Sequence, residues 1–151
     1  MDLRSKIREV PDFPTPGVGF KDITPLLLDH DALHQAVTEL SDWSKERNPD
    51  LILGAEARGF ILGAAIACHT GCGFVPARRP GKLPPETVSA TYMLEYGENS
   101  LELNADAIAD GARVVIHDDV LAAGGCFVIE LSFLGGRERV SQYDMYSLIR
   151  Y

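Results

Sequence analysis

Short apolar runs alternate along the chain with stretches in which apolar side chains recur at helical spacing. Residues 51–54 and 73–77 are apolar runs of the kind found in buried parallel strands. Helices are predicted at 31–48, with Asp31 as the N-terminal cap, and at 60–68. Further strands are predicted at 113–117, 127–133 and 143–151. This alternation of strands and helices predicts one domain, residues 1–151, with a mainly parallel α/β sheet flanked by helices.

Three segments fall outside this alternation. Residues 3–10 have amphipathic spacing and predict a short helix that ends at the first proline. Residues 11–20 hold three prolines and two glycines, a composition that excludes a regular helix or a central strand and predicts a rigid loop carrying Phe20. Alternation at 87–94 and 100–103 predicts a hairpin.

Composition and charge exclude several classes of partner. The 151 residues are 46% hydrophobic and 24% charged, as in an ordinary globular protein. A formal net charge of −8 disfavours a nucleic acid or an anionic membrane as partner. No apolar run has transmembrane length. The three cysteines, an odd number without a secretory signal, predict a reducing compartment, the cytoplasm, and no histidine and cysteine cluster forms a metal site.

The most specific chemical feature is the stretch 114–126. A hydrophobic strand leads to two adjacent acids, Asp118 and Asp119, and ligands of open α/β sheets bind at such carboxyl ends. Neighbouring carboxylates accept hydrogen bonds from the vicinal diol of a ribose. The following small residues allow backbone N–H groups to converge on a phosphate; they are Ala122, Ala123, Gly124, Gly125 and Cys126. The alternative reading is an acidic turn that only caps a strand.

This stretch resembles the phosphoribosyl-diphosphate (PRPP) signature of the type I phosphoribosyltransferases. Residues 11–25, 54–60, 78–84 and 90–97 also resemble, in the same order, segments of the adenine phosphoribosyltransferases. Four separate motifs in the right order are much more specific than any one of them. The resemblance extends from near the N-terminus to the end of the chain.

The resemblance implies the type I phosphoribosyltransferase fold, with an N-terminal hood loop at about 1–25 and a flexible hairpin at about 83–103. It implies transfer of the 5-phosphoribosyl group from PRPP to adenine, giving AMP and pyrophosphate in purine salvage. The reaction requires Mg²⁺, held mainly by substrate phosphates and water rather than by protein ligands. Members of the family are usually homodimers.

The resemblance also implies a role for particular residues. The Phe20 ring packs on adenine, and the backbone at Val18 and Lys21 reads the edge of the base. Glu95 is the acid/base group, and Tyr96 closes over the site. Asp118 and Asp119 bind the ribose and stabilise a ribosyl cation-like state. The cations matched to the pyrophosphate are Arg58, Arg78, Arg79 and Lys82.

Each of these residues also has a purely structural interpretation. Phe20 can be a core residue, Arg78 and Arg79 can be a solvated surface pair, and Glu95 can be a solvent-facing charge of the hairpin.

Two features depart from the family pattern. The loop at 122–126 reads Ala-Ala-Gly-Gly-Cys where the family has Ala-Thr-Gly-Gly-Thr, so both hydroxyl donors to the 5-phosphate are absent. Only the nine residues 118–126 separate two predicted strands, whereas a parallel crossover needs about a dozen residues or more. A crossover helix, with its loops roughly twenty residues, is therefore missing. Either the protein carries an internal deletion or these residues are missing from the sequence.

Two other functions stay open on these grounds. The changes at Ala123 and Cys126 favour a non-catalytic homologue that binds adenine or nucleotides, whereas Glu95 and the cations oppose it. A phosphoribosyltransferase for another 6-substituted purine is the third hypothesis, because backbone groups that read a purine edge leave little side-chain signature.

Overall fold

The computed structural model describes residues 1–94, 97–120, 126–130 and 141–151. Within them a five-stranded sheet has the order β4-β3-β7-β8-β9, and every neighbouring pair is parallel. Its strands, in chain order, are β3 (Leu51–Ala55), β4 (Gly73–Ala77), β7 (Val114–Val120), β8 (Cys126–Glu130) and β9 (Tyr146–Arg150). The predicted parallel α/β sheet is confirmed, and the acids Asp118 and Asp119 lie in the last part of β7.

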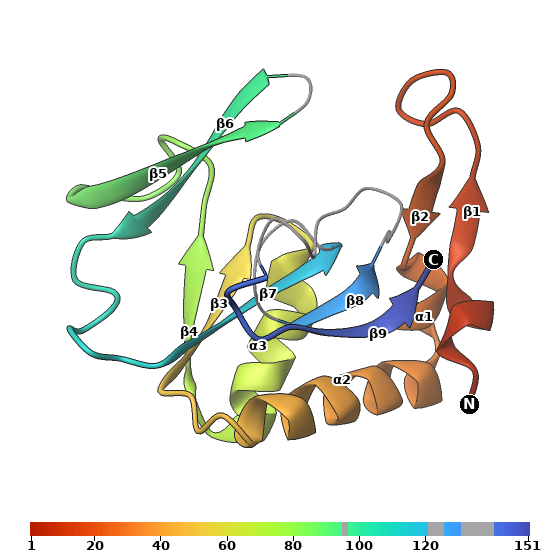
Figure 1. Cartoon of the computed structure of the whole chain (residues 1–151), viewed down its shortest axis with the longest axis horizontal. Coiled ribbons are helices and arrows are strands. Elements are labelled where there is room, and N and C mark those ends of the chain that lie inside the picture. Colours follow the sequence, from red (N-terminus) through yellow and green to blue (C-terminus); the bar gives the residue numbers. More distant parts are fainter. Residues whose placement is uncertain (95–96, 121–125, 131–140) are drawn as a thin grey trace.

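Two helices cover one face of this sheet. α3 (Gly59–Thr70) contacts β3, β4 and β7, while α2 (His30–Lys45) contacts β8, β9 and α3 (Figure 1). A Cβ atom at Gly54 would lie 2.8 Å from the Gly59 carbonyl oxygen and from the Phe74 ring, so glycine lets α3 start close to β3. The core between helices and sheet includes Leu40, Ile52, Leu62, Ile66 and Val128.

A hairpin stands at each end of the sheet, on the side of the strands' carboxyl ends (Figure 1). β1 (Arg8–Val10) and β2 (Phe20–Asp22) pair antiparallel beside β9 and frame the proline-rich loop. β5 (Thr87–Leu94) and β6 (Gly97–Asn104) pair antiparallel beside β4, which confirms the predicted hairpin. Arg78 and Glu102 bond through their backbones and tie this second hairpin to the end of β4.

Two local predictions are wrong. Residues 3–10 are not one helix: a 3-10 turn, Leu3–Lys6, is followed by β1, because pairing with β2 outweighs the weak helical preference of so short a segment. The N-terminal cap of α2 is Asp29 rather than Asp31, since Asp29 Oδ1 accepts a hydrogen bond from the Ala32 N–H at 3.0 Å. A short helix that the sequence did not predict, α1 (Thr24–Leu28), precedes it.

The connection between β7 and β8 is unusually short. The two strands are hydrogen-bonded parallel neighbours, with His117 opposite Cys126, and residues 121–125 alone separate them. A parallel connection that contains a helix needs about a dozen residues or more. The described strands therefore leave no room between them for a crossover helix, as predicted. Throughout the described ranges, no helix is long and apolar enough to cross a membrane.

Candidate active site

An arginine and a buried acid meet at the carboxyl edge of the sheet. Arg58 is the residue before α3, and its Nε forms an ion pair with Asp119 Oδ2. Only 3% of the Asp119 side chain is exposed, whereas half of the Arg58 side chain is. The guanidinium is therefore anchored on the sheet at one end and open to a ligand at the other.

Asp118 lies beside this ion pair in an unfavourable environment for a charge. Its Oδ1 accepts a hydrogen bond from the Asp119 N–H at 2.8 Å. Burial, followed by the neighbouring charge of Asp119, raises the pKa of Asp118 to about 7. A Cβ at Gly59 would lie 3.2 Å from Asp118 Oδ1, so the start of α3 closes over this carboxyl group.

The hood hairpin reaches the same place. The Phe20 ring centroid lies 5.2 Å from the Arg58 guanidinium carbon and 5.2 Å from the Phe13 ring centroid, in an edge-to-face arrangement. Phe20 is half-buried, and Val18 is 41% exposed. The Lys21 side chain turns to Glu9 and to the Tyr151 ring. The structure thus brings Phe20, Arg58 and the two acids together, and leaves the Lys21 side chain elsewhere.

Glu56 organises the cations that follow β4. Its carboxylate accepts a hydrogen bond from the Arg79 N–H at 2.7 Å and pairs with the Arg78 and Arg79 side chains at 3.4 and 3.5 Å. The bond from the Arg79 backbone, helped by Arg78, holds the pKa of Glu56 below its usual value. Arg78 Nη1 also donates to the Lys82 carbonyl oxygen at 3.2 Å. Glu56 was not predicted from the sequence as a site residue. The signal that could have identified it is its position two residues before Arg58.

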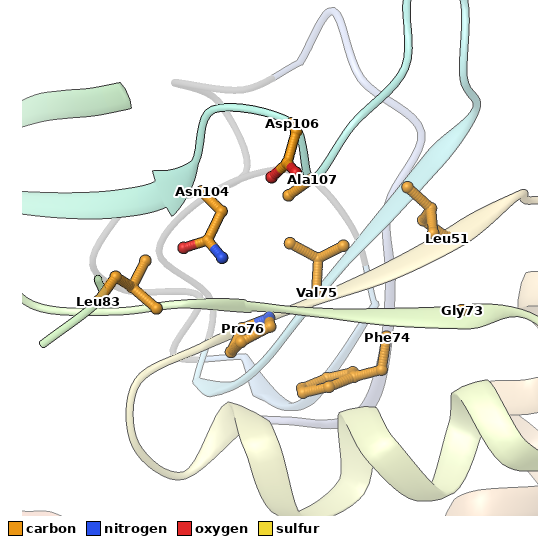
Figure 2. A pocket seen from close by; sticks show the side chains of 9 residues that line it. All are labelled: Leu51, Gly73, Phe74, Val75, Pro76, Leu83, Asn104, Asp106 and Ala107. Atoms are coloured by element: carbon orange, nitrogen blue, oxygen red, sulfur yellow. The ribbon is translucent and has the colours of Figure 1, made fainter. Parts of the chain in front are cut away.

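A hollow of about 300 Å³ lies elsewhere, against the outer strand of the sheet (Figure 2). In Figure 2, Asn104, the last residue of β6, and Asp106, which follows that strand, face Val75 of β4 across the hollow. Its lining includes none of the residues predicted to form the site. The cluster at the carboxyl edge, rather than this hollow, is the candidate active site.

Curated relatives match this chain over its full length. The adenine phosphoribosyltransferase of Desulfitobacterium hafniense is 49% identical, with 100% of this chain and 98% of that protein aligned. That of Clostridium acetobutylicum is 44% identical, over 100% and 99% of the two chains. This chain belongs to the adenine phosphoribosyltransferase family. No protein-family model matches the chain.

Solved structures of the family agree with this assignment. The adenine phosphoribosyltransferase of Thermoanaerobacter pseudethanolicus superimposes with a TM-score of 0.94 at 46% identity, over 99% of this chain and 98% of that one. The Giardia lamblia enzyme, complexed with 9-deazaadenine, gives a TM-score of 0.92 at 33% identity, over 99% and 96%. The resemblance seen in the sequence and the type I phosphoribosyltransferase fold are both confirmed.

The alignment lengths bear on the short connection after β7. This chain has 151 residues, but its match to the D. hafniense relative extends over 170. The excess, about twenty positions, is the size of one crossover helix with its loops. The aligned length thus exceeds this chain by about the number of residues that the short β7–β8 connection would need for a crossover helix.

Several predicted site residues lie outside the described residues. They are Glu95, Tyr96, Ala122, Ala123, Gly124 and Gly125. Cys126 is described, and it lies inside β8 rather than in a loop, fully buried. Its Sγ lies 3.9 Å from Ser44 Oγ and 3.7 Å from His117 Nδ1, and burial raises its pKa to about 12. The Cys126 thiol is a neutral core group, and Cys126 lies opposite His117 on the neighbouring strand. The structure does not place this thiol next to Asp118 and Asp119.

His117 is a second buried neutral group directly behind the acids. Its Nδ1 lies 2.8 Å from the Cys126 carbonyl oxygen, and Nε2 is buried without a partner among the described residues. Burial lowers the pKa of His117 from 6.5 to about 4. His117 and Asp118 are therefore adjacent residues whose pKa values are shifted in directions that keep both uncharged near pH 6.

These two shifts predict opposite effects of pH on stability. Unfolding lets His117 take up a proton between about pH 4 and 6.5, so its contribution to the free energy of unfolding rises with pH. Unfolding makes Asp118 release a proton between about pH 4 and 7, so its contribution falls with rising pH. In the unaltered chain the two contributions to the pH dependence of the free energy of unfolding offset each other.

Substituting either residue should leave only the pH dependence of stability that the other residue contributes. Between pH 5 and 6.5, His117→Gln should lose stability as pH rises and Asp118→Asn should gain it, each by up to about 1.4 kcal/mol per pH unit. Urea unfolding of both variants across this range measures the slopes. Slopes of the same sign in the two variants would contradict the assigned protonation states.

Proposed function

We propose that this chain transfers the 5-phosphoribosyl group from PRPP to adenine, giving AMP and pyrophosphate. The observation that carries the proposal is the convergence of Phe20, Arg58, Asp118 and Asp119 at the carboxyl edge of the sheet. An aromatic ring, a cation and two carboxylates match a flat base, a phosphate and a ribose diol. The solved yeast relative, complexed with adenine and an iminoaltritol bisphosphate, belongs to the same family.

In this proposal the two acids act on the ribose. Ionised carboxylates accept hydrogen bonds from its hydroxyl groups. These hydrogen bonds stabilise the ionised form of Asp118, so that ligand binding lowers its pKa and its proton is released to solvent. As the bond to pyrophosphate breaks, positive charge develops on the ribose ring, and the fixed negative charge beside it lowers the barrier. Arg58 neutralises Asp119 in the free protein and is half exposed, so it can turn to the phosphates of PRPP.

The loop after β4 is proposed to hold the leaving pyrophosphate. Arg78, Arg79 and Lys82 supply three positive charges, of which Glu56 balances one. Mg²⁺ is the proposed cofactor and would neutralise further charge on the leaving group. It prefers substrate phosphates and water as ligands, so the proposal requires no cluster of metal-binding side chains.

Glu95 is proposed as the acid/base group for the purine nitrogens, with Tyr96 covering the site. In the sequence these two residues stand between Leu94, the last residue of β5, and Gly97, the first residue of β6. Leu94 and Gly97 themselves pair across the hairpin. The backbone at Val18 and Lys21 is proposed to form hydrogen bonds with the edge of the adenine base. The proposed location of the protein is the cytoplasm.

Binding of PRPP tests the roles of the acids. Asp118→Asn combined with Asp119→Asn should weaken PRPP binding at least 10-fold, because two acceptors of the ribose hydroxyls lose their charge. Asp110→Asn, at an exposed position, is the matched control. Isothermal titration calorimetry measures both, with thermal unfolding alongside. Unchanged affinity with a large fall in melting temperature would assign the acids a structural role only.

A second function is favoured by one observation, the five-residue gap between β7 and β8. A chain that holds adenine but cannot hold the 5-phosphate would bind the base without catalysis, as a non-catalytic homologue. Adenine binding without AMP formation at any PRPP concentration would support this alternative.

A homodimer is proposed as the assembly, and α3 supports it. This helix is apolar on all sides, and helices of that kind are normally buried. Ile61, 50% exposed, lies on one stripe with the exposed Ala64 and Cys68, turned away from the sheet. A second copy packed on this stripe would cover it.

Ile61→Asp should therefore convert the dimer to a monomer, because a dimer would bury the new charge. Leu28→Asp places the same charge at a residue that is 79% exposed on α1 and should leave the dimer intact. Sedimentation velocity at several concentrations distinguishes the two states. A dimer that persists in Ile61→Asp would exclude this face of α3 as the interface.

A further inference from the structure

The last aromatic ring of the chain lies between two cations. Tyr151 follows β9, the edge strand next to the hood. Its ring centroid lies 4.0 Å from Lys21 Nζ and 4.7 Å from the Arg4 guanidinium carbon. Arg4 Nη2 also donates to the Arg150 carbonyl oxygen. The ring thus joins the end of the sheet to both the N-terminal turn and the hood.

Lys21 is held from two sides by these contacts. Its ammonium pairs with Glu9, its partner across the hood hairpin, and faces the Tyr151 ring. Only 14% of its side chain is exposed, although it is a lysine. A lysine so covered is a structural anchor rather than a solvated surface charge.

The neighbour of Lys21 on β2 is Phe20, whose ring lies over Arg58. Successive side chains of a strand point to opposite faces, so a contact that orients Lys21 also orients Phe20. β2 is consequently attached to the sheet on one face and to the site on the other. Loss of the Tyr151 ring would free the first attachment and let Phe20 move relative to Arg58.

We propose that Tyr151 is a positioning residue for the base: by contacting Lys21 and Arg4 it holds the hood on the sheet edge and so places the Phe20 ring for adenine. This inference rests on the proposed function, because it takes Phe20 to contact adenine. Tyr151 itself lies behind the hood strand and touches no reacting atom. Its effect falls on adenine rather than on PRPP, whose proposed ligands follow β3, follow β4 and lie on β7.

Two variants of Tyr151 and two ligands test the inference. Tyr151→Leu removes the aromatic face, and a cation–π contact of the usual strength predicts an adenine Kd raised about 3- to 10-fold. Tyr151→Phe keeps the face and should bind adenine like the unaltered chain. The Kd for PRPP should stay within about 2-fold in both, since a contact behind the hood changes only the base side. Direct titration of adenine and of PRPP supplies these values without any need for turnover.

The outcomes separate this inference from the proposed function. An unaltered chain that binds no adenine would overturn both. An unaltered chain that binds adenine, with Tyr151→Leu binding it equally well, would overturn only the positioning role. Equal weakening of adenine and PRPP binding in Tyr151→Leu, together with a lower melting temperature, would also overturn it, since Tyr151 would then be a general stabilising residue.

Discussion

Glu95→Gln is expected to lower the turnover of adenine to AMP about 10²- to 10⁴-fold while PRPP affinity stays nearly unchanged. Glutamine keeps the size and hydrogen-bonding reach of glutamate but cannot exchange a proton at neutral pH. As N9 of adenine attacks the ribose, the base must either lose its N9 proton or have its N7 hydrogen-bonded. A group that acts only in the transition state affects kcat rather than binding.

Glu86→Gln is the matched control for this experiment. It makes the same chemical change at an exposed position just before β5 and should leave kcat within about 2-fold. Steady-state kinetics with adenine varied, at saturating PRPP, gives kcat for both variants. A Glu95→Gln enzyme with unaltered kcat would show that Glu95 is a solvent-facing charge of the hairpin.

Replacing residues 121–125 with a connection about twenty residues longer, which carries the Ala-Thr-Gly-Gly-Thr loop of the family pattern and a following helix, is expected to raise PRPP affinity about 10- to 100-fold. The longer segment would supply hydroxyl donors and a helix N-terminus to the 5-phosphate, and one hydrogen bond to a charged group contributes about 1.5–3 kcal/mol. Adenine affinity should stay constant, because the hood is untouched.

A linker of glycine and serine of equal length controls for the insertion itself. This linker lengthens the connection without providing an ordered helix N-terminus, so it should produce little of the predicted rise in PRPP affinity. If both insertions leave PRPP affinity at the value of the 151-residue chain, the short connection does not limit binding.

The sequence predicted most of the sheet because its strands are short apolar runs, although β7 extends to Val120 beyond the predicted 113–117 and β9, Tyr146–Arg150, is shorter than the predicted 143–151. Residues 73–77 form β4 as predicted, and the two acids lie in the last part of β7. The missing crossover was also predictable, since it follows from counting residues between two strands. The family was predictable from four motifs in order.

Features that depend on pairing between distant segments were not predictable in the same way. The strand β1 exists because Val10 pairs with Phe20, and nothing in residues 8–10 alone favours a strand over a helix. Glu56 pairs with Arg78 and Arg79 only because β3 and β4 end side by side. The burial of Cys126 follows from the strand β8 beginning at that residue, where the motif predicted a loop.

The most direct measurement is AMP formation from adenine, PRPP and Mg²⁺ by the purified chain, with its intact mass confirming 151 residues. We predict AMP at a low rate that rises with PRPP into the millimolar range, because the residues proposed to contact the base, the ribose and the pyrophosphate are present and the proposed contacts to the 5-phosphate are reduced. Absence of AMP at saturating adenine and PRPP would contradict the proposed transfer. A rate typical of metabolic enzymes, above about 10 s⁻¹ at micromolar PRPP, would contradict the role assigned to the short connection.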